Sequence, residues 1–152
     1  MRVNHIAYVG GQAGHYKEEE IAAYFQKVRA KYPEANIITG SAPGAEAQIR
    51  ELATFCELDV TIPPVREELY DDALLMQVCE IVALGDVIIC MGTRGGKRVK
   101  LALEILKRVD TCREPHNRRH VVHIAEMKVP EAKAEPKGRV KSKRQRNARE
   151  TA

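Results

Sequence analysis

Short apolar runs alternate with amphipathic stretches along most of this chain, and no other feature of the sequence constrains the fold as strongly. The run 86–91 (DVIICM) is apolar without alternation, as expected of a central parallel strand that is covered on both faces. The stretch 17–31 instead places Ile21, Phe25 and Val28 at helical spacing. The pattern predicts strands over 5–9, 35–39, 58–62, 86–91 and 120–124, and helices over 17–31, 45–56, 67–84 and 99–109. This order predicts an α/β protein with a Rossmann-like, doubly wound, mostly parallel five-stranded sheet and about four helices.

The charge of the chain is divided unevenly between a body and a C-terminal tail. The 152 residues carry 25 Lys and Arg and 21 Asp and Glu, which gives a formal net charge of +4. Residues 127–152 hold nine basic and three acidic side chains, so residues 1–126 hold 16 basic and 18 acidic ones. We predict a folded ligand-binding domain over 1–126 and a disordered basic tail over 127–152, because the tail has too few apolar side chains to offset its ordering entropy.

Several classes of protein are disfavoured by the composition. No stretch approaches the roughly 18 consecutive apolar residues of a membrane-spanning helix, and the N-terminus lacks the pattern of a secretory signal. The four cysteines, Cys56, Cys79, Cys90 and Cys112, form no Cys-x-x-Cys pair, so neither a zinc site nor a disulfide framework is indicated. Cys79 and Cys90 are predicted to lie in the core. We expect a soluble cytoplasmic protein with no metal, no resident cofactor and no membrane partner.

Eight of the ten glycines lie in three turns that directly follow predicted strands. Because the loops beyond the carboxyl ends of parallel strands share one edge of the sheet, these turns would border a single crevice. Glycine lets the main chain approach a ligand closely, and the N-terminus of a following helix favours a phosphate or another anion. The candidate ligand-binding residues are Gly10, Gly11, Gly14, Gly40, Ser41, Pro43, Gly44, Gly92, Thr93, Arg94, Gly95, Gly96 and Lys97. The alternative is that these glycines only make tight strand-to-helix turns.

The turn 92–98 (GTRGGKR) carries the strongest of these signals. It combines a permissive backbone with a hydroxyl and three cations at the start of a predicted helix. None of the three turns has the G-x-G-x-x-G dinucleotide fingerprint, and the chain has no G-x-x-x-x-G-K-[ST] phosphate loop. The glycine turns therefore indicate an anion site without specifying which anion it binds.

The turn 39–46 (TGSAPGAE) resembles the Gly-Gly-Ala-x-Gly-Ala-Asp turn of the SLOG superfamily of Rossmann-like proteins, in its branch of small YspA-like proteins of bacteria and their phages. The similarity extends to the opening strand with its glycine turn, to 86–89 (DVII) and to 94–96 (RGG), and it covers about residues 3–125. The resemblance implies a nucleotide or nucleotide-derived ligand across the glycine turns, with its phosphate held by Gly95 and Gly96. It also implies a homo-oligomer, since related proteins often associate through helices that flank the sheet.

Glu46 stands where the family pattern has an acidic residue. The resemblance implies that its carboxylate accepts hydrogen bonds from a ribose, and Glu46 is the candidate catalytic residue of an alternative function, the hydrolysis of an N-glycosidic or phosphate bond. The competing interpretation is a solvated carboxylate on the first turn of a helix, which is favourable with the helix dipole. Phosphoribohydrolases of the superfamily use an Arg and a Glu around a Pro-Gly-Gly-x-Gly-Thr-x-x-Glu motif. This chain departs from that motif, because 95–100 reads GGKRVK and 74–84 contains no Arg.

The basic tail gives a second alternative, a nucleic-acid accessory protein. The cations of Lys137 to Arg149 (KGRVKSKRQRNAR) would neutralise phosphates and give affinity without sequence choice. No aromatic residue is interleaved with these charges, so base stacking is not indicated. The competing interpretation is a solubilising terminus that binds nothing specific.

Overall fold

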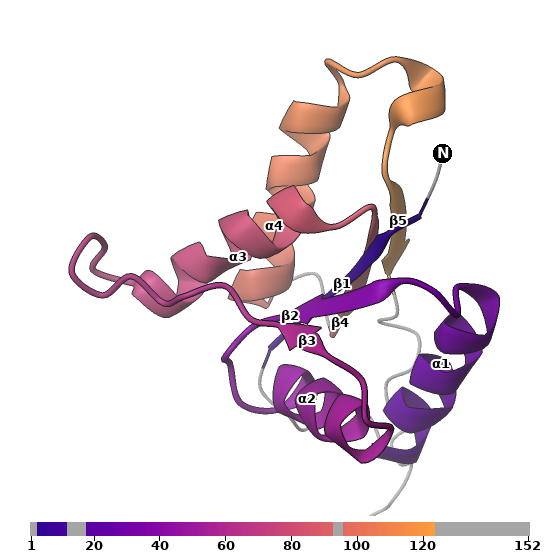
Figure 1. The fold of residues 1–152 in the computed structure, drawn as a ribbon. Helices are drawn as coiled ribbons and strands as arrows, with labels where there is room; N and C mark the ends of the chain where they lie inside the picture. Colours follow the sequence, from indigo (N-terminus) through magenta and orange to yellow (C-terminus); the bar gives the residue numbers. More distant parts are fainter. Residues whose placement is uncertain (1–2, 12–17, 93–95, 124–152) are drawn as a thin grey trace, which may run out of the picture.

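The described part of the chain forms an all-parallel, five-stranded sheet with four α-helices (Figure 1). In this computed structural model the described residues are 3–11, 18–92 and 96–123. The elements are β1 (His5–Gly10), α1 (Glu18–Lys31), β2 (Asn36–Thr39), α2 (Ala45–Phe55), β3 (Val60–Thr61), α3 (Ala73–Leu84), β4 (Val87–Met91), α4 (Lys97–Asp110), a 3-10 helix (Pro115–Asn117) and β5 (His120–His123). This architecture confirms the predicted Rossmann-like α/β fold. None of the described helices is both long and apolar enough to cross a membrane.

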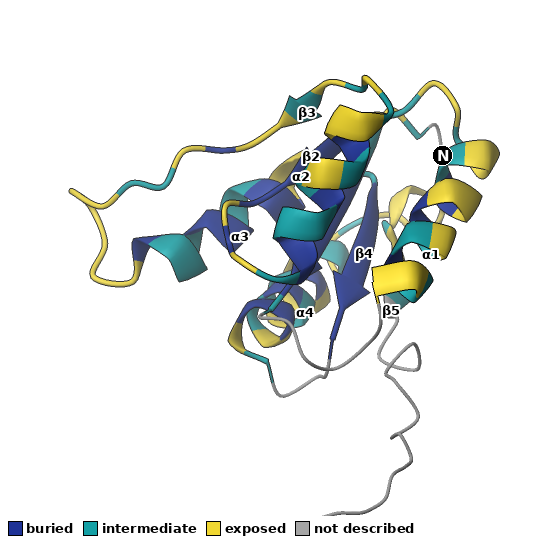
Figure 2. Ribbon diagram, turned by 90° about the horizontal axis from the view of Figure 1, so that it is seen from below, coloured by how far each residue is buried: buried dark blue, intermediate teal, exposed yellow. Residues whose placement is uncertain are grey.

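The sheet separates two apolar layers, because successive side chains of a strand point to opposite faces. Ile6 and Tyr8 of β1 pack with α1 and α2 on one face, whereas Ala7 and Val9 pack with α3 and α4 on the other. β4 is buried along its whole length (Figure 2). This burial explains why its sequence is apolar without alternation.

The order of strands across the sheet is β3-β2-β1-β4-β5. The chain therefore moves outward from β1 to β3 on one side, and then from β4 to β5 on the other. In register, Ile6 of β1 lies beside Ile37 of β2 and Val87 of β4. Because the direction of travel reverses between β1 and β4, the connection that leaves β1 goes to one face of the sheet and the connection that leaves β4 goes to the other.

The helix predicted over 67–84 is wrong at its start, because α3 begins only at Ala73. Asp72 is its N-cap, and the side chain accepts a hydrogen bond from the N–H of Leu75 at 3.3 Å, which satisfies a donor of the first turn. In the segment before the helix, Arg66 donates to Glu80 of α3 at 2.8 Å. That hydrogen bond and the charge of Arg66 lower the pKa of the Glu80 carboxyl.

Two further predictions about the core have different outcomes. Cys90 is fully buried in β4, and burial raises the pKa of its thiol to about 12. Cys79 on α3 is only partly buried, so the prediction that it lies in the core is wrong.

The strand predicted over 58–62 is shorter in the structure, where β3 covers only Val60–Thr61. Pro63 follows closely and has no N–H with which to extend the ladder of hydrogen bonds.

Candidate functional site

The three glycine turns begin at one edge of the sheet. β1 ends at Gly10, β2 ends at Thr39 and β4 ends at Met91, and these three strands are neighbours that run parallel. Their carboxyl ends therefore lie side by side. We call this region the carboxyl edge.

A buried ion pair joins two helices across the carboxyl edge. Glu46 lies in the first turn of α2 and Arg98 in the first turn of α4, on opposite faces of the sheet. The guanidinium donates from Nε to Oε2 and from Nη2 to Oε1 of the carboxylate, both at 2.8 Å. Glu46 is 0% exposed and Arg98 is 7% exposed. The pair is therefore bidentate and withdrawn from solvent, which makes it a strong link between the starts of α2 and α4.

Gln77 of α3 extends this pair into a network. Its Oε1 accepts from Nη2 of Arg98 at 3.2 Å and from the N–H of Ser41 at 2.9 Å. Its Nε2 donates to Oγ of Ser41 at 3.1 Å and to the carbonyl of Pro63 at 2.6 Å. Arg98 also donates to the carbonyl of Leu74 through Nη1. Three helices are thus tied to the turn after β2, and each polar group of Gln77 has a partner.

The network fixes the main chain of the glycine turns. The N–H of Gly10 donates to Oε2 of Glu46 at 2.9 Å, and the carbonyl of Gly40 accepts from Arg50. A Cβ on Gly40 would lie 2.6 Å from Oε1 of Gln77 and would also clash with Glu46 and Arg98. A Cβ on Gly10 would lie 2.8 Å from that of Ala45. At these two positions, the requirement for glycine comes from close packing.

Two other glycines of these turns are required by their backbone conformation. Gly44 and Gly92 have positive φ angles of 87° and 124°, which glycine adopts at no steric cost. Gly11 is different, because a Cβ there would meet nothing within 4 Å. Neither packing nor a positive φ angle accounts for it. Among the described residues there is therefore room for a side chain at Gly11.

Two helices begin at the carboxyl edge without a side-chain cap. The N-cap residues are Gly44 for α2 and Gly96 for α4, and neither can supply an accepting side chain. The N–H of Ala45 donates to the carbonyl of Gly11 at 3.2 Å. The first turn of α4 contains no acidic residue but does contain the exposed Lys97. The starts of α2 and α4 and the Lys97 side chain therefore bring partial and full positive charge to this edge, whereas the first turn of α1 carries Glu18, Glu19 and Glu20.

The structure places part of the predicted site at this edge. Ser41 and Pro43 are exposed in the turn after β2, and Gly96 and Lys97 lie at the start of α4. Gly14, Thr93, Arg94 and Gly95 lie outside the described residues, as does the basic segment 137–149. The roles predicted for all of these residues in ligand or nucleic-acid binding stay predictions.

Glu46 is not a solvated carboxylate. That interpretation is wrong, because the side chain is fully buried against Arg98 and Gly10. The first turn of α2 lies against the end of β1 and the start of α4, so a side chain of this turn can point inward. The predicted contact with a ribose, and the predicted catalytic role, stay predictions. In this structure, the two carboxylate oxygens accept hydrogen bonds from Arg98 and from the N–H of Gly10.

Gln77 was missed by reasoning from the sequence, and Arg98 was counted among the cations of an anion site, whereas the structure buries it against Glu46. Arg98 precedes Ala102 by four residues and Leu106 by eight, and both are buried in α4. Gln77 precedes Ile81 of α3 by four residues in the same way. A polar side chain on the apolar stripe of a helix is a detectable signal, since it needs a partner when buried. The identity of the partner depends on the tertiary structure.

The carboxyl edge shows no sign of a resident metal in the described residues. No group of three or more His, Cys, Asp or Glu side chains that could hold an ion occurs in that part of the chain.

A cavity of about 170 Å³ lies away from the carboxyl edge, between α1 and the strands β4 and β5. Residues 12–17 and 93–95, which follow β1 and β4 in the sequence, are outside the described residues.

A scan against protein-family models, a search of curated proteins and a search of solved structures each found no match to this chain. The resemblance to the SLOG superfamily stays a prediction.

Proposed function

We propose that the protein binds a nucleotide, or a phosphorylated ligand derived from one, at the carboxyl edge. The observation that carries this proposal is the meeting of two uncapped helix starts, those of α2 and α4, which the Glu46–Arg98 pair holds together from opposite faces of the sheet. Helix N-termini favour phosphate because their first N–H groups have no intrahelical acceptor. In open parallel sheets, ligands bind where the chain direction reverses, here between β1 and β4.

The side chains at the edge suit a phosphate and its attached sugar. Lys97 is exposed and supplies a cation beside the uncapped start of α4. Ser41 is also exposed, and because its Oγ accepts from Gln77, its hydroxyl hydrogen is free to donate to a ligand. Gly11 leaves open space beside the main chain. Lys97 and Ser41 thus supply hydrogen-bond donors at one edge of the sheet.

The buried hydrogen-bond network of Glu46, Gln77 and Arg98 would hold the turns of such a site in place. Glu46 holds the N–H of Gly10, and Gln77 holds the N–H and Oγ of Ser41. The turns are thereby fixed before a ligand arrives, which reduces the entropy lost on binding. In this role, Glu46, Gln77 and Arg98 are positioning residues.

Substitution of Lys97 by Ala tests the proposal. We expect nucleoside diphosphates and triphosphates to raise the melting temperature of the wild-type protein, because a ligand that binds only the folded state stabilises it. Loss of one charged hydrogen-bond donor should weaken the affinity about tenfold. Thermal-shift titration of both proteins measures this difference.

Lys107→Ala is the matched control, since Lys107 is exposed on the same helix near its opposite end. It should leave the affinity unchanged. Equal affinities of the Lys97 and Lys107 variants would contradict the placement of the phosphate at the start of α4. The absence of any shift for the wild-type protein with millimolar nucleotide would contradict the proposed function itself.

A further inference from the structure

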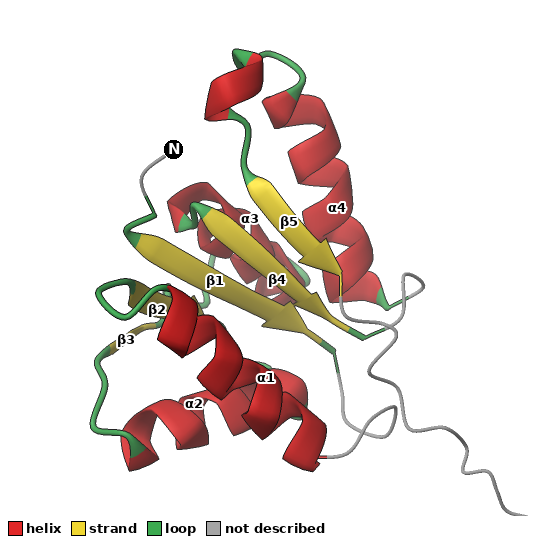
Figure 3. Cartoon of the chain, turned by 90° about the vertical axis from the view of Figure 1, so that its right-hand side faces the viewer, coloured by secondary structure: helices red, strands yellow, loops and turns green. Residues whose placement is uncertain are grey.

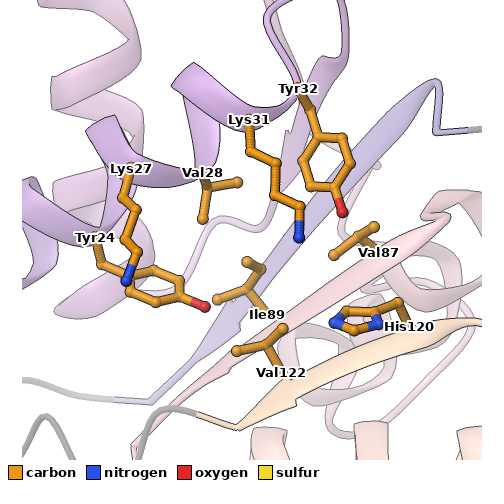
Figure 4. Close-up of a pocket in the computed structure, with 9 residues that line it drawn as sticks. All are labelled: Tyr24, Lys27, Val28, Lys31, Tyr32, Val87, Ile89, His120 and Val122. Atoms are coloured by element: carbon orange, nitrogen blue, oxygen red, sulfur yellow. The ribbon is translucent and has the colours of Figure 1, made fainter.

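A groove with an apolar floor and a cationic rim lies on the face of the sheet that carries α1 (Figure 4). Val87 and Ile89 of β4 and Val122 of β5 form the floor, and Lys27 and Lys31 extend over it from α1. The volume is about 170 Å³. An apolar floor beneath two lysines suits an amphipathic segment with acidic side chains.

The groove exists because the helices cover the two faces of the sheet unequally. On one face, α3 and α4 pack over the strands, and Cys90 of β4 lies in the same apolar cluster as Val99 and Leu106 of α4. On the other face, α1 and α2 lie toward β1, β2 and β3, and Figure 3 shows no described helix in front of β4 and β5. Val122 is therefore only partly buried, although it is apolar and faces the groove.

The handedness of the strand connections predicts which face of the sheet the chain would cover if it turned back over the sheet after β5. Connections that move from β1 toward β3 put α1 and α2 on the face with the groove, and connections that move toward β5 put α3 and α4 on the opposite face. This is the right-handed rule for parallel strands. β5 is an edge strand, so a segment that returns over the sheet moves toward β3 again. A right-handed connection in that direction lies on the face with the groove, so the returning segment would lie beside α1.

The sequence after β5 has the composition that this groove needs. Residues 124–136 (IAEMKVPEAKAEP) lie outside the described residues and contain three Glu and two Lys. Residues 137–152 contain seven Lys or Arg and one Glu. The change from mildly acidic to strongly basic therefore falls at Lys137, ten residues beyond the start of the predicted tail. Thirteen residues span about 20 Å even as a helix, enough to run back along β4, which has five residues at about 3.3 Å each.

We infer that residues 124–136 dock in the groove between α1 and β4–β5, with their apolar side chains on Val87, Ile89 and Val122 and their glutamates toward Lys27 and Lys31. The folded unit then extends to about residue 136 instead of ending at 126. The basic segment 137–152 starts near the amino ends of the strands, at the opposite edge from the glycine turns. This inference does not depend on the proposed nucleotide site.

Limited trypsin digestion of the full-length protein tests the inference. Lys128 and Lys133 lie within the proposed docked segment, whereas Lys137 and the later basic residues follow it. Docking should make cleavage after Lys128 and Lys133 at least about tenfold slower than cleavage after Lys137, because a protease needs the segment to open. Intact-mass spectra should then show a persistent product that ends at residue 137. Equal rates at all three lysines would overturn the inference.

A pair of variants on β5 provides the control. Val122→Asp places a charge on the floor of the groove and should abolish the protection of Lys128 and Lys133. Val121→Asp makes the same change one residue away, at a valine that is 37% exposed and does not line the groove, and should leave the protection intact. Protection that is lost on dilution, together with a dimer in sedimentation equilibrium, would overturn the inference in favour of a second copy of the chain in the groove.

Discussion

Substitution of Arg98 by Met should lower the free energy of unfolding by about 3–5 kcal/mol, because it leaves the carboxylate of Glu46 buried without its cation. The variant also loses the hydrogen bonds that Arg98 gives to Gln77 and to the carbonyl of Leu74. Glu46 is 0% exposed, so water cannot replace the missing donors in the folded state. Urea denaturation at neutral pH, compared with the wild-type protein, measures the loss.

Two further variants separate the effect of burial from the loss of an ion pair as such. Arg66→Met breaks a bidentate pair with Glu80 that is partly exposed, and it should cost far less. The double variant Glu46→Gln with Arg98→Met removes both charges and should be less destabilised than the sum of the two single variants. If Arg98→Met cost no more than Arg66→Met, the described role of the buried pair would be contradicted.

Substitution of Gly40 by Ala should be at least as damaging, although it adds a single methyl group. The new Cβ would lie 2.6 Å from Oε1 of Gln77 and would press on Glu46 and Arg98 as well. Overpacking a rigid site costs about 1–3 kcal/mol by itself, and here it also displaces a buried polar network. We expect a loss of more than about 3 kcal/mol in urea denaturation, or failure of the protein to accumulate in folded form.

Gly11→Ala is the matched control, since the same change there meets open space. The free energy of unfolding should stay within about 0.5 kcal/mol of the wild-type value. If Gly11 approaches a ligand, as proposed, the same variant should still bind nucleotide less tightly. A Gly40 variant as stable as the Gly11 variant would show that the network tolerates displacement and does not fix the turns.

The sequence was sufficient to predict the alternation of strands and helices, because burial on both faces makes β4 continuously apolar and one-sided packing gives α1 its helical spacing. It did not predict that β1 lies between β2 and β4, since the side chains of a parallel strand do not specify its neighbours. It also placed the start of α3 too early, because the charged residues before Asp72 are compatible with a helix. In the structure, α3 begins directly after its N-cap residue, Asp72.

The candidate site was predictable in outline only. The glycines indicated where the turns lie, but the sequence could not separate glycines required by packing, such as Gly40, from one that packing does not explain, such as Gly11. Glu46 was singled out by its place in the family pattern, whereas its partner Arg98 is 52 residues away and was counted among the three cations of the turn 92–98. Pairing across such a distance follows from the crossing of the chain from one face of the sheet to the other.

Native mass spectrometry of the full-length protein tests the nucleotide proposal most directly. The protein would be mixed with adenosine and guanosine, their monophosphates, diphosphates and triphosphates, and ADP-ribose. The proposal predicts a complex of one ligand per chain with one or more of the phosphorylated compounds and none with the two nucleosides, because the phosphate is held at the starts of α2 and α4. No complex with any phosphorylated compound at millimolar concentration, or equal binding of the nucleosides, would contradict it.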